Sequence, residues 1–350
     1  MTPRLTILVP AFNEATRLPA GMERFAAAVA DGAVDIGDTE VVVIDDGSTD
    51  GTSATARRLL AHLPHHRVIT LQANGGKGAA VRSGVAGTRT PYVAYMDADM
   101  AIDPHAVPSL LGALSTTDGA IGSRALVDSM VDGTYAVRAV MGRLFNRLVT
   151  TGTGLGLQDT QCGFKAFRTP AARLLFHLVP IDRFAFDVEL LARARRLGLR
   201  ITEVPVQWKN VPGSTIHPLH DSVTMLSDVY RSRFGLLATP PVPGIVVRVR
   251  SGPGIGGAGD PSELTSADRI AKVVADTLDG APVPVVTSGP SVVTLLPLVD
   301  PVEVAAVYSA LRAEFDSLEV TRQSMTIEAL AGLGALSGRL RAASEPPGMT

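Results

Sequence analysis

The sequence predicts an α/β protein in which a mostly parallel, doubly wound sheet is flanked by helices and followed by a small C-terminal α/β extension. Three observations lead to this prediction. Strand, loop and helix patterns alternate four times before residue 100. The strands are short, apolar and rich in β-branched residues, which is typical of buried parallel strands. Polar side chains gather where each strand ends, and doubly wound sheets bind their ligands at that edge.

The elements follow from these patterns in order. Apolar runs predict strands over 5–10, 40–44, 67–71, 92–96 and 119–122. Helices are expected between them, from about 18 to 30 and then ending near 63 and 87. Another helix is expected to end near 198, and 201–208 is predicted as one further strand.

The composition excludes several classes of protein. The 350 residues carry a net charge of −2, with 32 basic and 34 acidic side chains, which argues against a nucleic-acid-binding protein. The single cysteine, Cys162, excludes an internal disulfide and fits a reducing compartment. No apolar run reaches the roughly 18–20 residues of a membrane span, and a strand near residue 5 leaves no room for a signal peptide. We therefore expect a soluble or peripherally attached cytoplasmic protein.

The fourth strand ends in two acids one residue apart, Asp97 and Asp99. Carboxylates at such a position are suitable ligands for Mg²⁺ or Mn²⁺ when a substrate supplies phosphate oxygens as well. The alternative is a solvated turn with two incidental acids.

Two motif matches fail on inspection. Residues 46–51 begin like a calcium loop, but Arg57 stands where a bidentate Glu is needed. Residues 75–78 resemble a phosphate-binding loop, but Leu71 replaces its first Gly and Gly78 its Ser or Thr. Backbone N–H groups at this helix start, together with Lys77, are still expected to receive an anion. The alternative is a tight turn with a surface lysine.

The best amphipathic helix is predicted over 137–149. Its apolar stripe either packs on the core or meets lipid, with arginines facing anionic headgroups. Both hold if the helix packs on the domain and lines a groove open to a membrane.

Further polar segments follow. Cys162 is predicted to be a small packing residue, because no His nearby in sequence could activate it. Aromatic residues flank Asp187, which indicates a carboxylate in a partly apolar pocket. His217 and His220 are separated by Pro218 and are interpreted as surface residues rather than metal ligands.

In order, these segments resemble the family 2 glycosyltransferases, which have the GT-A fold. Within that family they are most similar to dolichyl- or polyprenyl-phosphate β-glucosyltransferases, and next to dolichyl-phosphate mannose synthases. The resemblance covers about residues 4 to 235. Its segments are 9–14 (VPAFNE), 45–50 (DDGSTD), 74–79 (NGGKGA), 96–101 (MDADMA), 122–124 (GSR), 159–165 (DTQCGFK), 184–189 (FAFDVE) and 203–208 (EVPVQW).

The resemblance implies a metal-dependent, inverting transfer of a hexose from a nucleotide sugar to a polyprenyl phosphate. The nucleotide-sugar-binding residues would be Pro10, Ala11, Phe12, Asn13, Glu14, Asp45, Asp46, Lys77, Asp97 and Ala98. Asp97 and Asp99 would hold Mg²⁺ or Mn²⁺, and Arg124 and Arg138 would receive the lipid phosphate. Asp187, Asp99 and Lys77 are the predicted catalytic residues, with Asp187 matching the position assigned as base or as organiser of the acceptor site.

The acceptor phosphate is already an anion at neutral pH, so a general base is not required. We therefore expect Asp187 to orient the acceptor side rather than to remove a proton.

Three features depart from the family pattern. Ala101 replaces the polar residue of the mannose synthases, which favours the glucosyl branch. Thr215 replaces the usual Lys after Gly-Ser, so Lys209 is predicted to supply the phosphate-facing charge instead. Residues beyond about 240 match nothing in the family.

The predicted domains are a GT-A domain over 1–238, a Pro/Gly-rich linker over 239–262 and a small α/β module over 263–345. In the module, helices are expected after Ser266, from Asp300 and over 325–342, with strands at 283–287 and 291–296. Packing on the transferase, formation of a homo-oligomer and partner binding are all open roles for it.

The favoured function is glucose transfer from UDP-glucose at the inner face of the membrane, to which the protein would bind peripherally. Within the enzyme class, the alternatives are GDP-mannose as donor and a soluble hydroxyl acceptor. From another class, the alternative is a non-catalytic nucleotide-sugar-binding protein.

Overall fold

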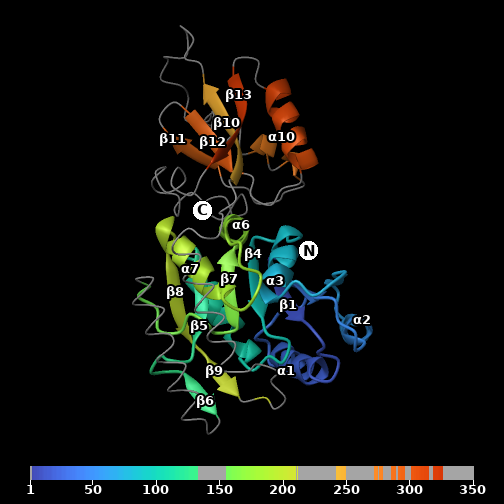
Figure 1. Ribbon diagram of the computed structural model, residues 1–350. Helices are drawn as coiled ribbons and strands as arrows, with labels where there is room; N and C mark the ends of the chain where they lie inside the picture. The colour runs from blue at the N-terminus through green and yellow to red at the C-terminus, as the bar shows by residue number, and fades with distance from the viewer. Residues whose placement is uncertain are drawn as a thin grey trace.

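The computed structural model describes residues 2–132, 155–209 and 211, and then the segments 242–249, 272–274, 276–278, 285–288, 291–295, 301–314 and 318–325 (Figure 1). Four features predicted from sequence lie outside these ranges. They are the helix over 137–149 with Arg138, the loop with Thr215, the pair His217 and His220, and all but the first residue of the predicted helix over 325–342.

A seven-stranded sheet forms the centre of the N-terminal part, with the strand order β3-β2-β1-β4-β7-β5-β8. Its strands are β1 (Leu5–Ala11), β2 (Thr39–Asp45), β3 (His66–Thr70), β4 (Tyr92–Met96), β5 (Gly119–Ser123), β7 (Phe164–Arg168) and β8 (Ile201–Pro205). Only β7 runs antiparallel to its neighbours in this sheet, between β4 and β5. The predicted fold, a mostly parallel α/β sheet, is therefore confirmed.

Helices cover both faces of this sheet. They are α1 (Leu18–Ala30), α2 (Thr52–Leu60), α3 (Lys77–Ala86), α4 (Val107–Ala113), α6 (Thr169–Leu178) and α7 (Phe186–Arg196). Alternation along β1 divides the core, because Leu8 packs with α3, α6 and α7 while Ile7 and Val9 pack with α1, α2 and α4. Within the described ranges, no helix has both the length and the apolarity that crossing a bilayer requires.

The run 201–208, predicted as one strand, forms two. β8 ends at Pro205, and β9 (Gln207–Lys209) then pairs with β6 (Met130–Asp132) in a small separate sheet. A proline has no N–H to donate and is tolerated on an edge strand, which is where β8 lies. The break directs β9 toward the loop that follows β4, and Lys209 N donates to Ala101 O at 2.8 Å.

A second sheet follows near the C-terminal end, with the order β11-β12-β10-β13. Its elements are β10 (Val242–Val249), β11 (Val285–Ser288), β12 (Ser291–Leu295) and β13 (Leu318–Met325), with α10 (Pro301–Glu314) beside them (Figure 1). The expectation of a linker over 239–262 is wrong for β10, which pairs with both β12 and β13. Pro243 and Gly244 resemble breakers, but the β-branched residues after them favour a strand.

Candidate active site

The loops after β1 and β2 are joined at the carboxyl edge of the sheet. Asn13 N donates to Ser48 Oγ at 2.9 Å, Thr49 N donates to Asn13 Oδ1 at 3.0 Å, and Glu14 N donates to Thr52 Oγ1 at 2.8 Å. Asn13 has φ 53°, a left-handed conformation that Asn tolerates better than most residues. The segments containing Asn13, Glu14, Asp45 and Asp46 are thus brought together, as predicted.

The carboxylate of Asp46 is buried and is used inside the protein. Its two oxygens accept hydrogen bonds from Gly75 N at 2.9 Å and Gly76 N at 2.8 Å. Asp45, equally buried, accepts one from Ser48 N at 2.9 Å. The expectation that backbone N–H groups of the Gly-rich turn receive a ligand anion is therefore wrong for Gly75 and Gly76, because Asp46 already occupies them.

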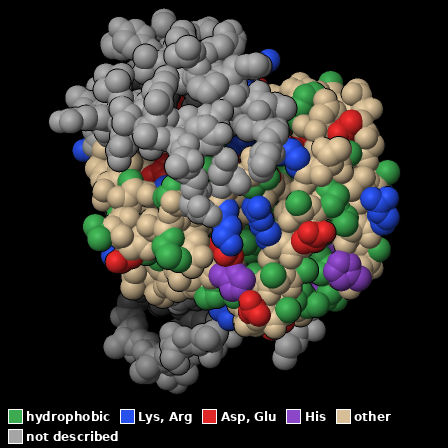
Figure 2. Space-filling view, turned by 90° about the horizontal axis from the view of Figure 1, so that it is seen from below, with side chains coloured by type: hydrophobic (Ala, Val, Ile, Leu, Met, Phe, Trp, Pro, Cys, Tyr) green, Lys and Arg blue, Asp and Glu red, His purple; other side chains and the backbone are tan. Residues whose placement is uncertain are grey.

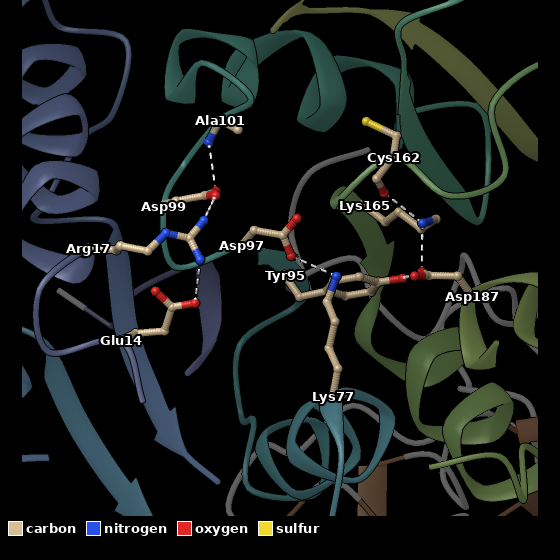
Figure 3. A network of polar contacts seen from close by, with 10 residues as sticks. All are labelled: Glu14, Arg17, Lys77, Tyr95, Asp97, Asp99, Ala101, Cys162, Lys165 and Asp187. Atoms are coloured by element: carbon tan, nitrogen blue, oxygen red, sulfur yellow. Dashed lines mark hydrogen bonds and ion pairs between the residues drawn. The ribbon is translucent and has the colours of Figure 1, made fainter. Parts of the chain in front are cut away.

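Lys77 and Asp97 form an ion pair across the edge, with 2.6 Å between Lys77 Nζ and Asp97 Oδ1 (Figure 3). Lys77 begins α3, and Asp97 directly follows β4. Burial alone would lower the pKa of Lys77, but the charges of Asp97 and Asp187 raise it above its ordinary value. A fixed positive charge therefore lies beside the acid pair at pH 7.

The turn that carries Asp99 is held by one face of α1. Arg24 Nη1 donates to the carbonyl oxygens of Asp99 and Met100, each at 3.2 Å. Met100 has φ 44°, an uncommon conformation for a residue with a side chain. Gly21 packs so closely that a Cβ there would overlap the carbonyl of Ala98. Helix α1 thus determines where the second acid of the pair lies.

Gly21→Ala is expected to lower the melting temperature by several degrees. The added methyl group meets backbone rather than a side chain that can turn away, and overpacking of this kind costs about 1–3 kcal/mol. Gly112→Ala in α4 is the matched control, because a Cβ there meets nothing within 4 Å and alanine favours a helix by about 1 kcal/mol. Thermal unfolding followed by circular dichroism measures both, and equal melting temperatures would contradict the close packing at Gly21.

Arg17 connects the second acid to Glu14. Its Nη2 donates to Asp99 Oδ2, and its Nη1 donates to Glu14 Oε1 at 2.9 Å (Figure 3). Burial raises the pKa of Glu14 to about 7, which the charge of Arg17 opposes. Burial and the charge of Asp97 likewise raise the pKa of Asp99. Asp97 and Asp99 therefore repel each other in a partly buried turn.

Asp187 lies deeper, in a buried network with Tyr95 and Lys165. Its Oδ1 accepts from Tyr95 Oη at 2.5 Å and from Lys165 Nζ at 2.6 Å (Figure 3). Lys165 has no exposed surface and also donates to Cys162 O at 2.7 Å. Burial, followed by the charge of Asp187, raises the pKa of Tyr95 well above its ordinary value. Cys162 itself is buried in the core, as predicted, and burial raises the pKa of its thiol to about 12.

The segment 159–165 connects three parts of the site. Asp159 binds Arg124, with Nε–Oδ2 at 2.7 Å and Nη2–Oδ1 at 2.9 Å. Gly163 abuts Asp97 so closely that a Cβ would overlap its carboxylate. Lys165 ends the segment at Asp187. Arg124, predicted to bind a phosphate, is therefore oriented by a carboxylate but remains partly exposed.

The remaining predicted residues lie around this centre. Pro10 and Phe12 are partly or well exposed, whereas Ala11 and Ala98 are buried. Lys209 is exposed, with its backbone beside the turn of the acid pair. Figure 2 looks at the lower end of Figure 1, where Lys and Arg side chains gather near the middle of the described surface with Asp and Glu side chains beside them.

The sequence did not predict roles for Arg17, Tyr95 and Lys165. Arg17 shares one helix face with Gly21 and Arg24, at spacings of four and three, and this spacing was a usable signal. Tyr95 and Lys165 are cross-strand partners in β4 and β7. That pairing needed the antiparallel position of β7, which sequence patterns did not provide.

The acid pair fits a divalent cation. It offers two hard oxygen ligands in one turn, and Mg²⁺ sites commonly consist of one or two carboxylates plus substrate phosphates. Asp97 is 45% exposed, so it is accessible from solvent. Within the described ranges, no group of three or more His, Cys, Asp or Glu side chains is arranged to hold a metal by itself. An ion here would take its remaining ligands from water or from a phosphorylated ligand.

Comparison with known proteins identifies a matching family and several similar relatives. Residues 6–176 match the family model described as glycosyl transferase family 2. The chain is 36% identical over 245 residues to a dolichyl-phosphate beta-glucosyltransferase of Dictyostelium discoideum, covering 67% of this chain and 75% of that protein. It is 34% identical over 244 residues to the human protein of the same name, covering 65% and 74%.

Among solved structures, one similar fold is glucosyl-3-phosphoglycerate synthase from Mycobacterium tuberculosis in complex with Mn²⁺, UDP-glucose and phosphoglyceric acid. The TM-score is 0.50 at 22% identity, covering 69% of this chain and 83% of that one. At this identity the likeness concerns the fold alone.

Proposed function

Since the chain belongs to glycosyl transferase family 2 and has the GT-A fold, we propose that it transfers glucose from UDP-glucose to dolichyl or another polyprenyl phosphate, with inversion and with a divalent cation. The relatives named above support this donor sugar and acceptor. The observation that carries the proposal is the acid pair at the end of β4 with Lys77 ion-paired beside it.

The donor side of the reaction needs positive charge where the leaving diphosphate forms. Asp97 and Asp99 would hold Mg²⁺ or Mn²⁺, which neutralises a leaving diphosphate when bound. Lys77 adds a charge that stays protonated throughout the neutral range, because Asp97 and Asp187 raise its pKa. The loop after β1, which carries Asn13 and Glu14, is hydrogen-bonded to the loop after β2, and together they would hold the nucleoside.

The acceptor side needs a positioned phosphate. Arg124 is oriented by Asp159 and partly exposed, so it can present remaining N–H donors to a lipid phosphate. Arg138 and Lys209 are proposed to assist. Asp187 receives two strong hydrogen bonds on one oxygen, which supports its role in orienting this side rather than removing a proton. We also propose membrane contact at the cytoplasmic face through residues 137–149, which the sequence predicts to form an amphipathic helix.

Asp187→Asn is expected to retain measurable transfer to a lipid phosphate, about 100-fold below wild type. The acceptor is already ionised, and the asparagine oxygen still accepts hydrogen bonds, so positioning is impaired rather than abolished. Transfer of radiolabelled glucose to polyprenyl phosphate measures the effect, with circular dichroism as the control for folding. Complete loss of transfer in a folded variant would count against an orienting role for Asp187.

The donor is tested with a panel of nucleotide sugars. Thermal stabilisation of the full chain is measured with UDP-glucose and with GDP-mannose, with and without Mn²⁺, and transfer of the bound sugar to polyprenyl phosphate is then measured. We expect Mn²⁺-dependent stabilisation by UDP-glucose and label in the lipid fraction. Selective stabilisation by GDP-mannose would overturn the donor, and binding without transfer would indicate a non-catalytic protein.

A further inference from the structure

The orientation of Asp99 is fixed without Arg17. Ala101 N donates to Asp99 Oδ1 at 3.1 Å, Arg24 holds the carbonyl of Asp99 itself, and Gly21 packs under the turn. What Arg17 adds is a positive charge on the other carboxylate oxygen, Oδ2. That oxygen is one of the ligands that the proposed function assigns to the divalent cation.

Two polar atoms in this cluster are buried without a hydrogen-bond partner, Arg17 Nε and Glu14 Oε2. Unpaired buried polar atoms are uncommon and costly, so each calls for an explanation. Here the two belong to residues already joined through Arg17 Nη1 and Glu14 Oε1. A two-bond pairing of a guanidinium with a carboxylate would satisfy both atoms. Glu14 therefore has the capacity to hold Arg17 more fully once Arg17 leaves Asp99.

We propose that Arg17 is a built-in counter-ion of Asp99: it neutralises Asp99 Oδ2 in the donor-free protein, yields that oxygen to the divalent cation, and is then held by Glu14. The proposal rests on the proposed function, because it takes Asp99 as a metal ligand. Arg17 acts through the charge of Asp99 and is not itself proposed to touch the donor or the acceptor.

The physical consequence is a competition between two cations. A guanidinium in contact with Asp99 and a divalent ion on the same carboxylate repel each other. An ion that arrives alone must displace Arg17, whereas an ion that arrives with a diphosphate brings negative charge that offsets the repulsion. Metal and nucleotide are thus expected to bind together much more tightly than the metal binds alone.

The test is Mn²⁺ binding to the full chain without nucleotide, measured from the electron paramagnetic resonance signal of free Mn²⁺. Arg17→Met is expected to bind Mn²⁺ about tenfold more tightly than wild type, because no charge-assisted hydrogen bond has to be broken first. Arg17→Gln, which keeps a polar side chain at the start of α1, is a second variant and should show the same direction. Arg58→Met is the matched control, since it removes an exposed cation from α2 and should leave Mn²⁺ affinity unchanged.

A double variant locates the ion. In Arg17→Met with Asp99→Asn, the gain in Mn²⁺ affinity should disappear. Unchanged or weaker Mn²⁺ binding in both folded Arg17 variants would overturn the proposal, and so would a gain that survives Asp99→Asn. The proposed function can fail independently of this inference. If Arg17→Met binds Mn²⁺ more tightly but the wild-type protein transfers no sugar, the counter-ion role of Arg17 is supported and the proposed transferase activity is wrong.

Discussion

Replacing Lys165 by methionine is expected to lower the free energy of unfolding by about 3–5 kcal/mol, the largest effect on stability among the substitutions considered. Lys165 is fully buried, and its ammonium group is the cation that faces Asp187 Oδ1 at 2.6 Å. Methionine fills the same space but removes the ion-pair partner of a buried carboxylate, which keeps its hydrogen bond from the hydroxyl group of Tyr95. Urea unfolding followed by circular dichroism measures the change.

Two further variants serve as controls for Lys165→Met. Arg67→Met breaks the half-exposed ion pair with Glu40 and should cost about 1 kcal/mol or less. Lys165→Met combined with Asp187→Leu replaces both charges by apolar groups and should recover most of the loss, because a buried pair removed as a whole is often neutral. If Lys165→Met costs no more than Arg67→Met, the buried pair does not stabilise the fold.

Lys77→Met is expected to lower kcat/KM for sugar transfer by about 100- to 1,000-fold, the loss typical of removing one group that stabilises developing negative charge. The Nζ atom of Lys77 lies 2.6 Å from Asp97, at the edge where the donor diphosphate is proposed to bind. Methionine keeps an unbranched side chain but removes the charge, which lies 6.0 Å from the ring centroids of Tyr95 and Phe186. Initial rates with UDP-glucose and polyprenyl phosphate measure the effect.

The control for Lys77 removes one positive charge elsewhere. Arg58→Met should keep wild-type kcat/KM, since Arg58 is exposed on α2. The reduction in Lys77→Met should also appear in kcat at saturating donor, because charge stabilisation acts on the leaving group. A change confined to KM would mean that Lys77 binds the donor without assisting departure of the diphosphate.

Much of this fold follows from sequence because each element carries its own signal. The β-branched runs that predict β1 and β2 and the apolar run that predicts β4 form largely buried strands, and α1 spans the predicted range. The polar loops converge because parallel strands place their carboxyl ends at one edge. Topology therefore places Asp97 and Lys77 at the same edge of the sheet, but it does not make them neighbours, because β2 and β1 lie between β3 and β4.

The rest depends on tertiary contacts that no local pattern encodes. The antiparallel position of β7 places Lys165 opposite Tyr95, and both then reach Asp187. Asp46 takes the N–H groups of Gly75 and Gly76, a use of the turn that composition does not distinguish from binding a ligand. The sequence predicts a linker where β10 lies, because Pro243 and Gly244 usually interrupt strands. β10 nevertheless pairs with β12 and β13.

The reversed direction of β7 has a wider consequence for how this protein can change. Each parallel strand ends at the edge of the sheet where the candidate active site lies. The antiparallel strand β7 instead begins at that edge, directly after the segment 159–163. That short stretch contacts Arg124 through Asp159 and Asp97 through Gly163, and Lys165, the second residue of β7, contacts Asp187. Inserting a single residue into 159–163 would disturb the contacts with Arg124, Asp97 and Asp187 together. A change in this segment that alters specificity for one substrate is therefore expected to alter specificity for the other as well.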